Sequence, residues 1–116
     1  MRNKNPIAKV FEITYDDPTI LEGNRWAVYA NFRLVGTNEK KVHNDNIYFV
    51  VCSPEYKENP SEEIDIDTAK TVVLPFLDKT YLEDYIKSIV DTINKSSPKS
   101  WAEYYSRLEA SFDIDH

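Results

Sequence analysis

The stretch NIYFVVCS, residues 46–53, is apolar at every position from Ile47 to Cys52. A strand buried on both faces of a sheet has such a continuous apolar run, whereas a strand with one exposed face alternates apolar and polar residues. Pro54 follows directly and cannot continue a ladder of backbone hydrogen bonds. The stretch therefore predicts a central strand that ends where the chain turns away.

Three other segments predict further strands. In RWAVYANFRLV, every second residue from Trp26 to Leu34 is apolar, which indicates a strand with one buried face. Pro75 in KTVVLPFL has no backbone donor, so this strand should lie at an edge of the sheet or near its own end. The residues Gly36-Thr37-Asn38-Glu39 break the pattern as a turn would. The three predicted strands are 8–15, 25–35 and 70–77.

The second half of the chain predicts two amphipathic helices, because apolar residues recur there at the spacing of one helical face. Thr80 with Glu83, and Ser100 with Glu103, have the spacing of capping boxes. We interpret both apolar stripes as core, the aromatic one included. The first helix is predicted over 80–93, with Leu82, Tyr85, Ile86, Ile89, Val90 and Ile93, and the second over 100–112, with Trp101, Tyr104, Tyr105, Leu108 and Phe112.

Strands followed by helices along the chain predict an α+β domain. We expect an antiparallel β-meander of about four strands with two C-terminal helices packed on one face. All of it should form a single domain of residues 1–116. The residues 112–115 either add a short strand or fray.

The composition argues against several classes of function. A formal charge of −6 and a pI of about 4.9 do not suit nucleic-acid binding, which needs a basic face. Two glycines are too few for a phosphate-cradling loop, and one cysteine with two histidines gives no zinc pattern. We therefore expect no cofactor and no metal. An acidic surface suits a basic protein partner, although solubility alone is the commoner reason for such a charge.

The expected location is cytoplasmic. The first residues, MRNKNPIAKV, include basic side chains without the apolar segment of a signal peptide. No apolar run approaches the roughly 20 residues of a membrane span. The lone cysteine fits a reducing compartment.

Cys52 and Ser53, placed between a strand and a turn, are the candidates for a catalytic nucleophile. A catalytic thiol needs a base within hydrogen-bond distance. His43 precedes Cys52 by nine residues, roughly 30 Å along a straight strand, and His116 is the last residue. Ser53 has no flanking glycine to form a nucleophile elbow. The sequence thus favours a structural cysteine and predicts that the protein is not an enzyme.

The segment PEYKENPSEEIDID, residues 54–67, has six carboxylates and a single lysine. It joins two predicted strands and should be an exposed, partly extended connection. One hypothesis, favoured by base rates, is a solubilising loop. The other is an acidic docking surface with a tyrosine anchor, because tyrosine is enriched in binding hot spots. The candidate partner-binding residues are Glu55, Tyr56, Glu58, Glu62, Glu63, Asp65 and Asp67.

Several segments together resemble a known family. They are RWAVYANFRLVG at 25–36, VCSPEY at 51–56, SWAEYYSRLE at 100–109 and FDID at 112–115. In their order and spacing they resemble the eighth immunity-protein family of bacterial polymorphic toxin systems. Lys57 stands where that family often has a leucine, and the tail lacks the family's usual tryptophan.

The resemblance implies a non-enzymatic protein that binds the C-terminal toxin domain of a cognate effector in the cytosol and blocks it. A nuclease toxin would offer a basic surface, on which an acidic inhibitor takes the place of the substrate phosphates. The alternative is a small intracellular enzyme or ligand-binding domain with a pocket between sheet and helices.

If Cys52 is structural, Cys52→Ala leaves function intact, because no step of the activity uses the thiol. The measurement is the protein's activity in a variant shown by circular dichroism to be folded. Loss of activity in such a folded variant would contradict this interpretation.

Overall fold

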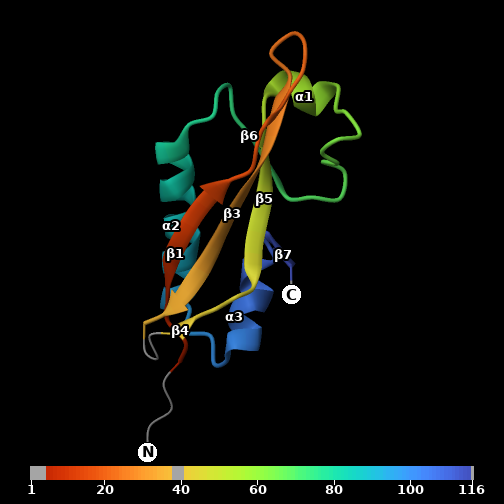
Figure 1. Cartoon of the computed structure of the whole chain (residues 1–116). Coiled ribbons are helices and arrows are strands. Elements are labelled where there is room, and N and C mark those ends of the chain that lie inside the picture. Colours follow the sequence, from red (N-terminus) through yellow and green to blue (C-terminus); the bar gives the residue numbers. More distant parts are fainter. Residues whose placement is uncertain (1–4, 38–40, 116) are drawn as a thin grey trace, which may run out of the picture.

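The computed structural model describes residues 5–37 and 41–115, so Asn38 and Glu39 of the predicted turn lie outside the described residues. Within these ranges the chain forms one seven-stranded sheet and three helices (Figure 1). The α+β class is confirmed. In chain order the elements are β1 (Ala8–Tyr15), β2 (Thr19–Ile20), β3 (Trp26–Gly36), β4 (Lys41–Val42), β5 (Asn46–Cys52), α1 (Pro54–Glu58), β6 (Thr71–Val73), α2 (Lys79–Lys95), α3 (Trp101–Leu108) and β7 (Asp113–Asp115).

The strands β3 and β5 form the centre of the sheet. They are antiparallel, and their register runs from Ala27 opposite Cys52 to Phe32 opposite Ile47. The other edge of β5 is shared by two short strands, β6 beside its C-terminal half and β7 beside its N-terminal half. β5 therefore has partners along both edges, which confirms the central strand predicted from its apolar run. The pairing of β7 also confirms the strand alternative for the C-terminal residues.

The predicted four-strand meander is wrong at β6. The strands β1, β3 and β5 are successive antiparallel neighbours, but β6 runs parallel to β5. A parallel neighbour requires a crossover of a dozen or more residues, because the chain must return to the end at which the previous strand began. Residues 53–70, including α1, make this crossover. β6 lies at an edge of the sheet and ends before Pro75, as expected.

The helices α2 and α3 cover one face of the sheet, as predicted, and lie behind it in Figure 1. Their apolar side chains pack on the residues of β3 and β5 that point to this face, including Phe32 and Phe49. Phe112, just after α3, contacts both rings, with centroid distances of 4.9 Å and 5.4 Å. The main core therefore lies between the sheet and these two helices.

The opposite face of the sheet is covered over half its length. Tyr56, Ile64 and Ile66, from the crossover, pack on Ala27, Val50 and Cys52 and form a second, smaller core. Towards β7 the second core does not extend over the described part of this face, where Asn31 and Tyr48 are half-buried and Arg33 is exposed. The crossover thus divides the face into a covered half and an uncovered half.

The N-terminus of α2 differs from the predicted capping box. Asp78 is the N-cap, and its carboxylate accepts a hydrogen bond from the backbone N–H of Tyr81 at 3.0 Å. Thr80, predicted to cap with Glu83, is already inside the helix. Aspartate and threonine are both good N-caps, and the chain offers them two positions apart, so spacing alone did not distinguish them.

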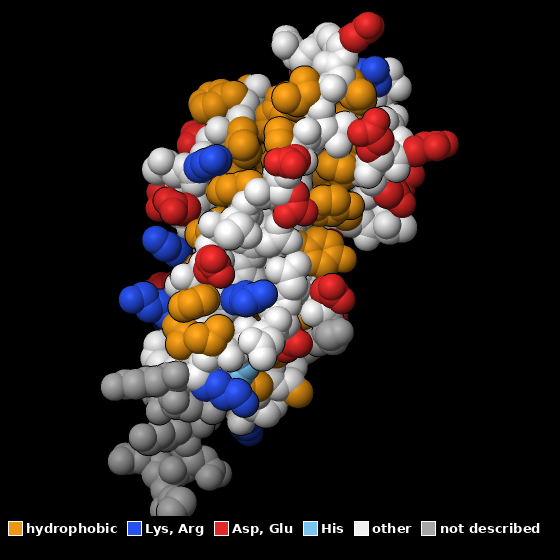
Figure 2. All heavy atoms as spheres, viewed as in Figure 1, with side chains coloured by type: hydrophobic (Ala, Val, Ile, Leu, Met, Phe, Trp, Pro, Cys, Tyr) orange, Lys and Arg blue, Asp and Glu red, His pale blue; other side chains and the backbone are white. Residues whose placement is uncertain are grey.

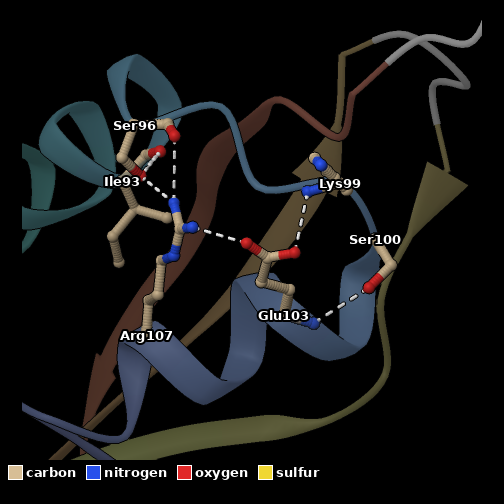
Figure 3. Close-up of polar contacts among 6 residues, drawn as sticks. All are labelled: Ile93, Ser96, Lys99, Ser100, Glu103 and Arg107. Carbon is tan, nitrogen blue, oxygen red and sulfur yellow. Dashed lines mark hydrogen bonds and ion pairs between the residues drawn. The ribbon is translucent and has the colours of Figure 1, made fainter.

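The N-terminus of α3 agrees with the sequence more closely (Figure 3). The Oγ of Ser100 accepts a hydrogen bond from the backbone N–H of Glu103 at 3.1 Å. The Glu103 carboxylate accepts from the backbone N–H of Lys99, one residue before the expected donor, at 3.2 Å. Arg107 then pairs with Glu103 and donates to the carbonyl oxygen of Ser96, which ties α3 to the end of α2.

The side-chain amide of Asn94 connects the β1 strand of the sheet with the helices α2 and α3. The Oδ1 of Asn94, in α2, accepts from the N–H of Ala8 at 2.9 Å, and its Nδ2 donates to the Ala8 carbonyl at 2.8 Å. The hydroxyl of Tyr104, in α3, donates to the same Oδ1 at 2.6 Å. Burial raises the pKa of Tyr104 well above its usual value, so the hydroxyl stays protonated and remains a donor. Asn94 thus pairs with the β1 backbone as a neighbouring strand would.

We expect Asn94→Ala to lower the free energy of unfolding by about 2 kcal/mol, because the Ala8 backbone loses both of its hydrogen bonds to this amide, and the Tyr104 hydroxyl keeps only its longer bond to the Val90 carbonyl. Ser88→Ala, on the exposed side of α2, is the control and should change it by less than about 0.5 kcal/mol. Urea unfolding measures both. Equal values for the two variants would contradict the role of Asn94.

Candidate partner-binding surface

The acidic segment, residues 54–67, starts from a buried serine. The Oγ of Ser53 accepts hydrogen bonds from the backbone N–H groups of Trp26, at 3.1 Å, and Tyr56, at 3.2 Å. The first bond holds the serine to β3, and the second caps α1. Pro54 occupies the first position of α1, where a helix needs no N–H donor. The chain therefore leaves β5 in one defined direction.

Tyr56 is fully buried, so the predicted exposed anchor is wrong. Its ring is part of the second core, and its hydroxyl donates to the Ile64 carbonyl at 2.7 Å. The same hydroxyl lies 3.1 Å from the Oγ of Ser61. Tyrosine has an apolar ring and one polar group, so it can serve inside a fold as well as in an interface. Here the buried ring and hydroxyl of Tyr56 hold the acidic segment against the sheet.

The carboxylates of the segment point away from this core. Glu58, Glu62, Glu63, Asp65 and Asp67 are exposed, and Glu55 is half-buried. Ile64 and Ile66, which alternate with them, are buried. The segment is therefore a short helix followed by a folded loop, and the prediction of a partly extended connection is wrong. In Figure 2 acidic side chains gather over α1 and this loop.

The loop is also concave. A hollow of about 400 Å³ is lined by Glu62, Asp65, Ile66 and Asp67, together with Pro60 and Ser61. Asp65 holds the local turn, because its Oδ1 accepts from the backbone N–H of Asp67 at 2.9 Å. Among residues 5–37 and 41–115, none of the six carboxylates forms a salt bridge. The hollow thus presents negative charge that the described part of the fold does not neutralise.

A second surface, which the sequence analysis missed, is the uncovered half of the sheet. We call it the open face, and it comprises Tyr29, Asn31, Arg33, Asn46, Tyr48, Asp113 and Asp115. Tyr48 pairs with Asp113, and Asn46 with Asp115, across β5 and β7, so these side chains share one face. Tyr29 and Asn31 belong to the residues of 25–35 that alternate with the apolar ones. Nothing in that pattern indicates that the face stays uncovered.

The open face is ordered by side-chain contacts across strands. The rings of Tyr29 and Tyr48 meet edge to face, with centroids 6.0 Å apart. The Asn46 amide donates to the Asn31 Oδ1 at 3.0 Å, and the Asn31 amide donates to the Asp16 Oδ1 at 3.1 Å. Such cross-strand pairs restrict side-chain rotation. The face is therefore a preformed surface of aromatic, amide and carboxylate groups with the guanidinium of Arg33.

Both candidate nucleophiles, Cys52 and Ser53, are buried. Cys52 is fully buried, and burial raises the pKa of its thiol, an effect that Lys57 partly offsets. Cys52 lies opposite Ala27, whereas the backbone N–H of His43 bonds to Leu34, about 23 Å further along β3. His43 contacts the Trp101 ring, with centroids 4.1 Å apart, and His116 lies outside the described residues. The described residues therefore place no base beside Cys52.

The alternative of a ligand-binding pocket is matched best by a groove of about 540 Å³ between β1 and α2. It is lined mostly by charged and small side chains, among them Lys9, Asp84 and Lys87. The Asn94 amide in this groove is already bonded at both of its polar atoms to Ala8. The lining of the groove includes no aromatic side chain, whereas small-molecule sites usually have them.

Among the described residues, no cluster of three or more His, Cys, Asp or Glu side chains has the geometry to hold a metal ion. In the same part of the chain, none of the helices combines the length and apolar character of a membrane span. Comparison with protein-family models, with curated proteins and with solved structures finds no match. The resemblance to the immunity-protein family stays a prediction from the sequence.

We expect Tyr56→Phe to lower the free energy of unfolding by about 1–2 kcal/mol, because the buried Ile64 carbonyl loses its donor. The variant should also increase amide hydrogen exchange selectively in residues 59–67. Tyr81→Phe is the matched control, since Tyr81 is 49% exposed, and it should change neither quantity. Unchanged exchange in Tyr56→Phe would show that the acidic segment is held by other contacts.

Proposed function

We propose that this protein is an immunity protein, which binds a cognate bacterial toxin domain and neutralises it by occluding the toxin's functional surface. The observation that carries the proposal is the construction of the acidic segment. Its apolar side chains are buried against the sheet, and its carboxylates face solvent around a hollow. The sequence resemblance supports the same role.

The combination of a buried anchor and exposed carboxylates in the acidic segment favours tight and rapid binding. A segment that is already ordered loses little conformational entropy on association, so more of the contact energy appears as affinity. Uncompensated negative charge accelerates encounter with a basic partner at low ionic strength. A solubilising loop needs neither a buried anchor such as Tyr56 nor a defined hollow. The partner that fits is therefore a protein domain with a basic patch.

The proposed mechanism needs no catalysis. The inhibitor covers the toxin's surface, and if the toxin is a nuclease, the carboxylates of Glu62, Glu63 and Asp67 take the positions of substrate phosphates. The site of action is the cytoplasm of the toxin-producing cell, where the toxin domain would otherwise act. A pocket-based enzyme has weaker support, because the Asn94 amide in the β1–α2 groove is bonded at both ends to Ala8.

The first experiment is a paired growth and co-purification assay. The C-terminal domain of the protein encoded immediately upstream is expressed with and without this chain. We expect the domain to stop growth, this chain to restore growth, and the two proteins to co-purify. Toxicity that this chain does not relieve, without a recovered complex, would contradict the proposed function.

Charge reversal then tests the surface. We expect Glu62→Lys with Glu63→Lys to slow association with the toxin domain about tenfold at low salt, and the wild-type rate to fall as salt is added. Asp65 is left unchanged because it holds the turn. Glu83→Lys with Asp84→Lys, an exposed acidic pair on α2, is the control. Stopped-flow measurements giving equal rates for both double variants would exclude the segment from the interface.

A further inference from the structure

The open face combines two aromatic rings with two carboxylates, the groups that bind cations, and it is separate from the acidic segment. Its one cationic side chain among the described residues, Arg33, is exposed on β3. Tyr29 and Tyr48 are both half-buried, so part of each ring faces solvent. Asp113 lies directly across from Tyr48, and Asp115 lies two residues further along β7, opposite Asn46. Burial, followed by the charges of Asp113 and Asp115, raises the pKa of Tyr48. These carboxylates are therefore close enough to act electrostatically on the aromatic group.

The face is also continuous with the acidic segment, and a cleft opens beside Tyr48 at the edge of the sheet, where Phe112 and Ile114 of the main core contribute to its lining. Tyr29 packs against the second core, at the border of the segment. A cleft of about 410 Å³ is lined by Tyr48, Lys70 and Asp113, with Glu109, Phe112 and Ile114. Lys70 bonds through its backbone N–H to the Asp113 carboxylate. A partner in contact with the acidic segment would therefore meet the tyrosine pair next.

We propose that the open face docks an arginine-bearing segment of a basic protein partner, with a guanidinium stacked on the Tyr29–Tyr48 pair and neutralised by Asp113 and Asp115. Arginine suits this site because its planar guanidinium stacks on aromatic rings and binds carboxylates through two hydrogen bonds. This inference rests on the proposed function for the identity of the partner. It assigns the partner's chemistry and adds a contact surface outside residues 54–67.

The first test uses the wild-type chain and two peptides, hexa-arginine and hexa-lysine. Titration followed by amide chemical shifts should perturb residues around Tyr29, Tyr48 and Asp115, with hexa-arginine bound several times more tightly than hexa-lysine. Shift changes confined to residues 54–67, no saturable binding, or equal affinity for the two peptides would overturn the inference. Equal affinity would mean that charge alone is recognised.

The second test uses variants that keep the strands intact. Tyr48→Thr should weaken hexa-arginine binding about three- to thirtyfold, the range for a lost cation–π contact, and Asp115→Asn should weaken it about threefold. Tyr81→Ala and Asp84→Asn, which change exposed side chains on α2, are the matched controls and should bind as the wild type does. If Tyr48→Thr does not fold, Asp115→Asn decides by itself. Unchanged binding by both open-face variants would overturn the inference.

The same variants separate this inference from the proposed function. If the wild-type chain neither binds nor neutralises the toxin domain, the proposed function fails, while the peptide titration still decides whether the open face binds arginine. If the wild-type chain neutralises the toxin and Tyr48→Thr and Asp115→Asn form complexes as stable as the wild type's, the inference fails and the proposed function stands.

Discussion

The buried hydroxyl of Ser53 is the contact on which the rest of the architecture depends. It accepts hydrogen bonds from two backbone donors, one in β3 and one in α1. Because of it, the chain leaves the central strand into a helix that lies over the sheet. The crossover that follows brings β6 back parallel to β5 and covers one half of a sheet face. The other half stays open.

Both candidate surfaces follow from that division of the face. In the acidic segment, burial of Tyr56, Ile64 and Ile66 forces the alternating carboxylates outward, since neighbouring side chains in a folded loop cannot all enter the same core. On the open face, the short strand β7 brings Asp113 and Asp115 beside an aromatic pair from strands far away in sequence. The two surfaces adjoin at Tyr29, so one partner can contact both.

The sequence predicted elements correctly where a local pattern of residues has only one structural explanation. The alternation in 25–35 and the helical stripe after Thr80 each have a period that only one kind of element satisfies, and both elements form. The prediction was wrong where one type of residue suits two environments equally well. Tyr56 was expected outside because tyrosine is common in interfaces, yet its ring is equally suited to a core that provides an acceptor for the hydroxyl.

The sequence by itself determined the class of fold, the central place of the 46–53 strand, the structural burial of Cys52 and the excess of negative charge, because composition and short-range periodicity are properties of the chain. Only the tertiary structure decided the parallel pairing of β6, the burial of Tyr56 and the open face. The physical reason is that each depends on contacts between distant segments. The direction of a strand, the burial of a side chain and the neighbours of a carboxylate all depend on the segment that packs against them. No local pattern in the sequence specifies that segment.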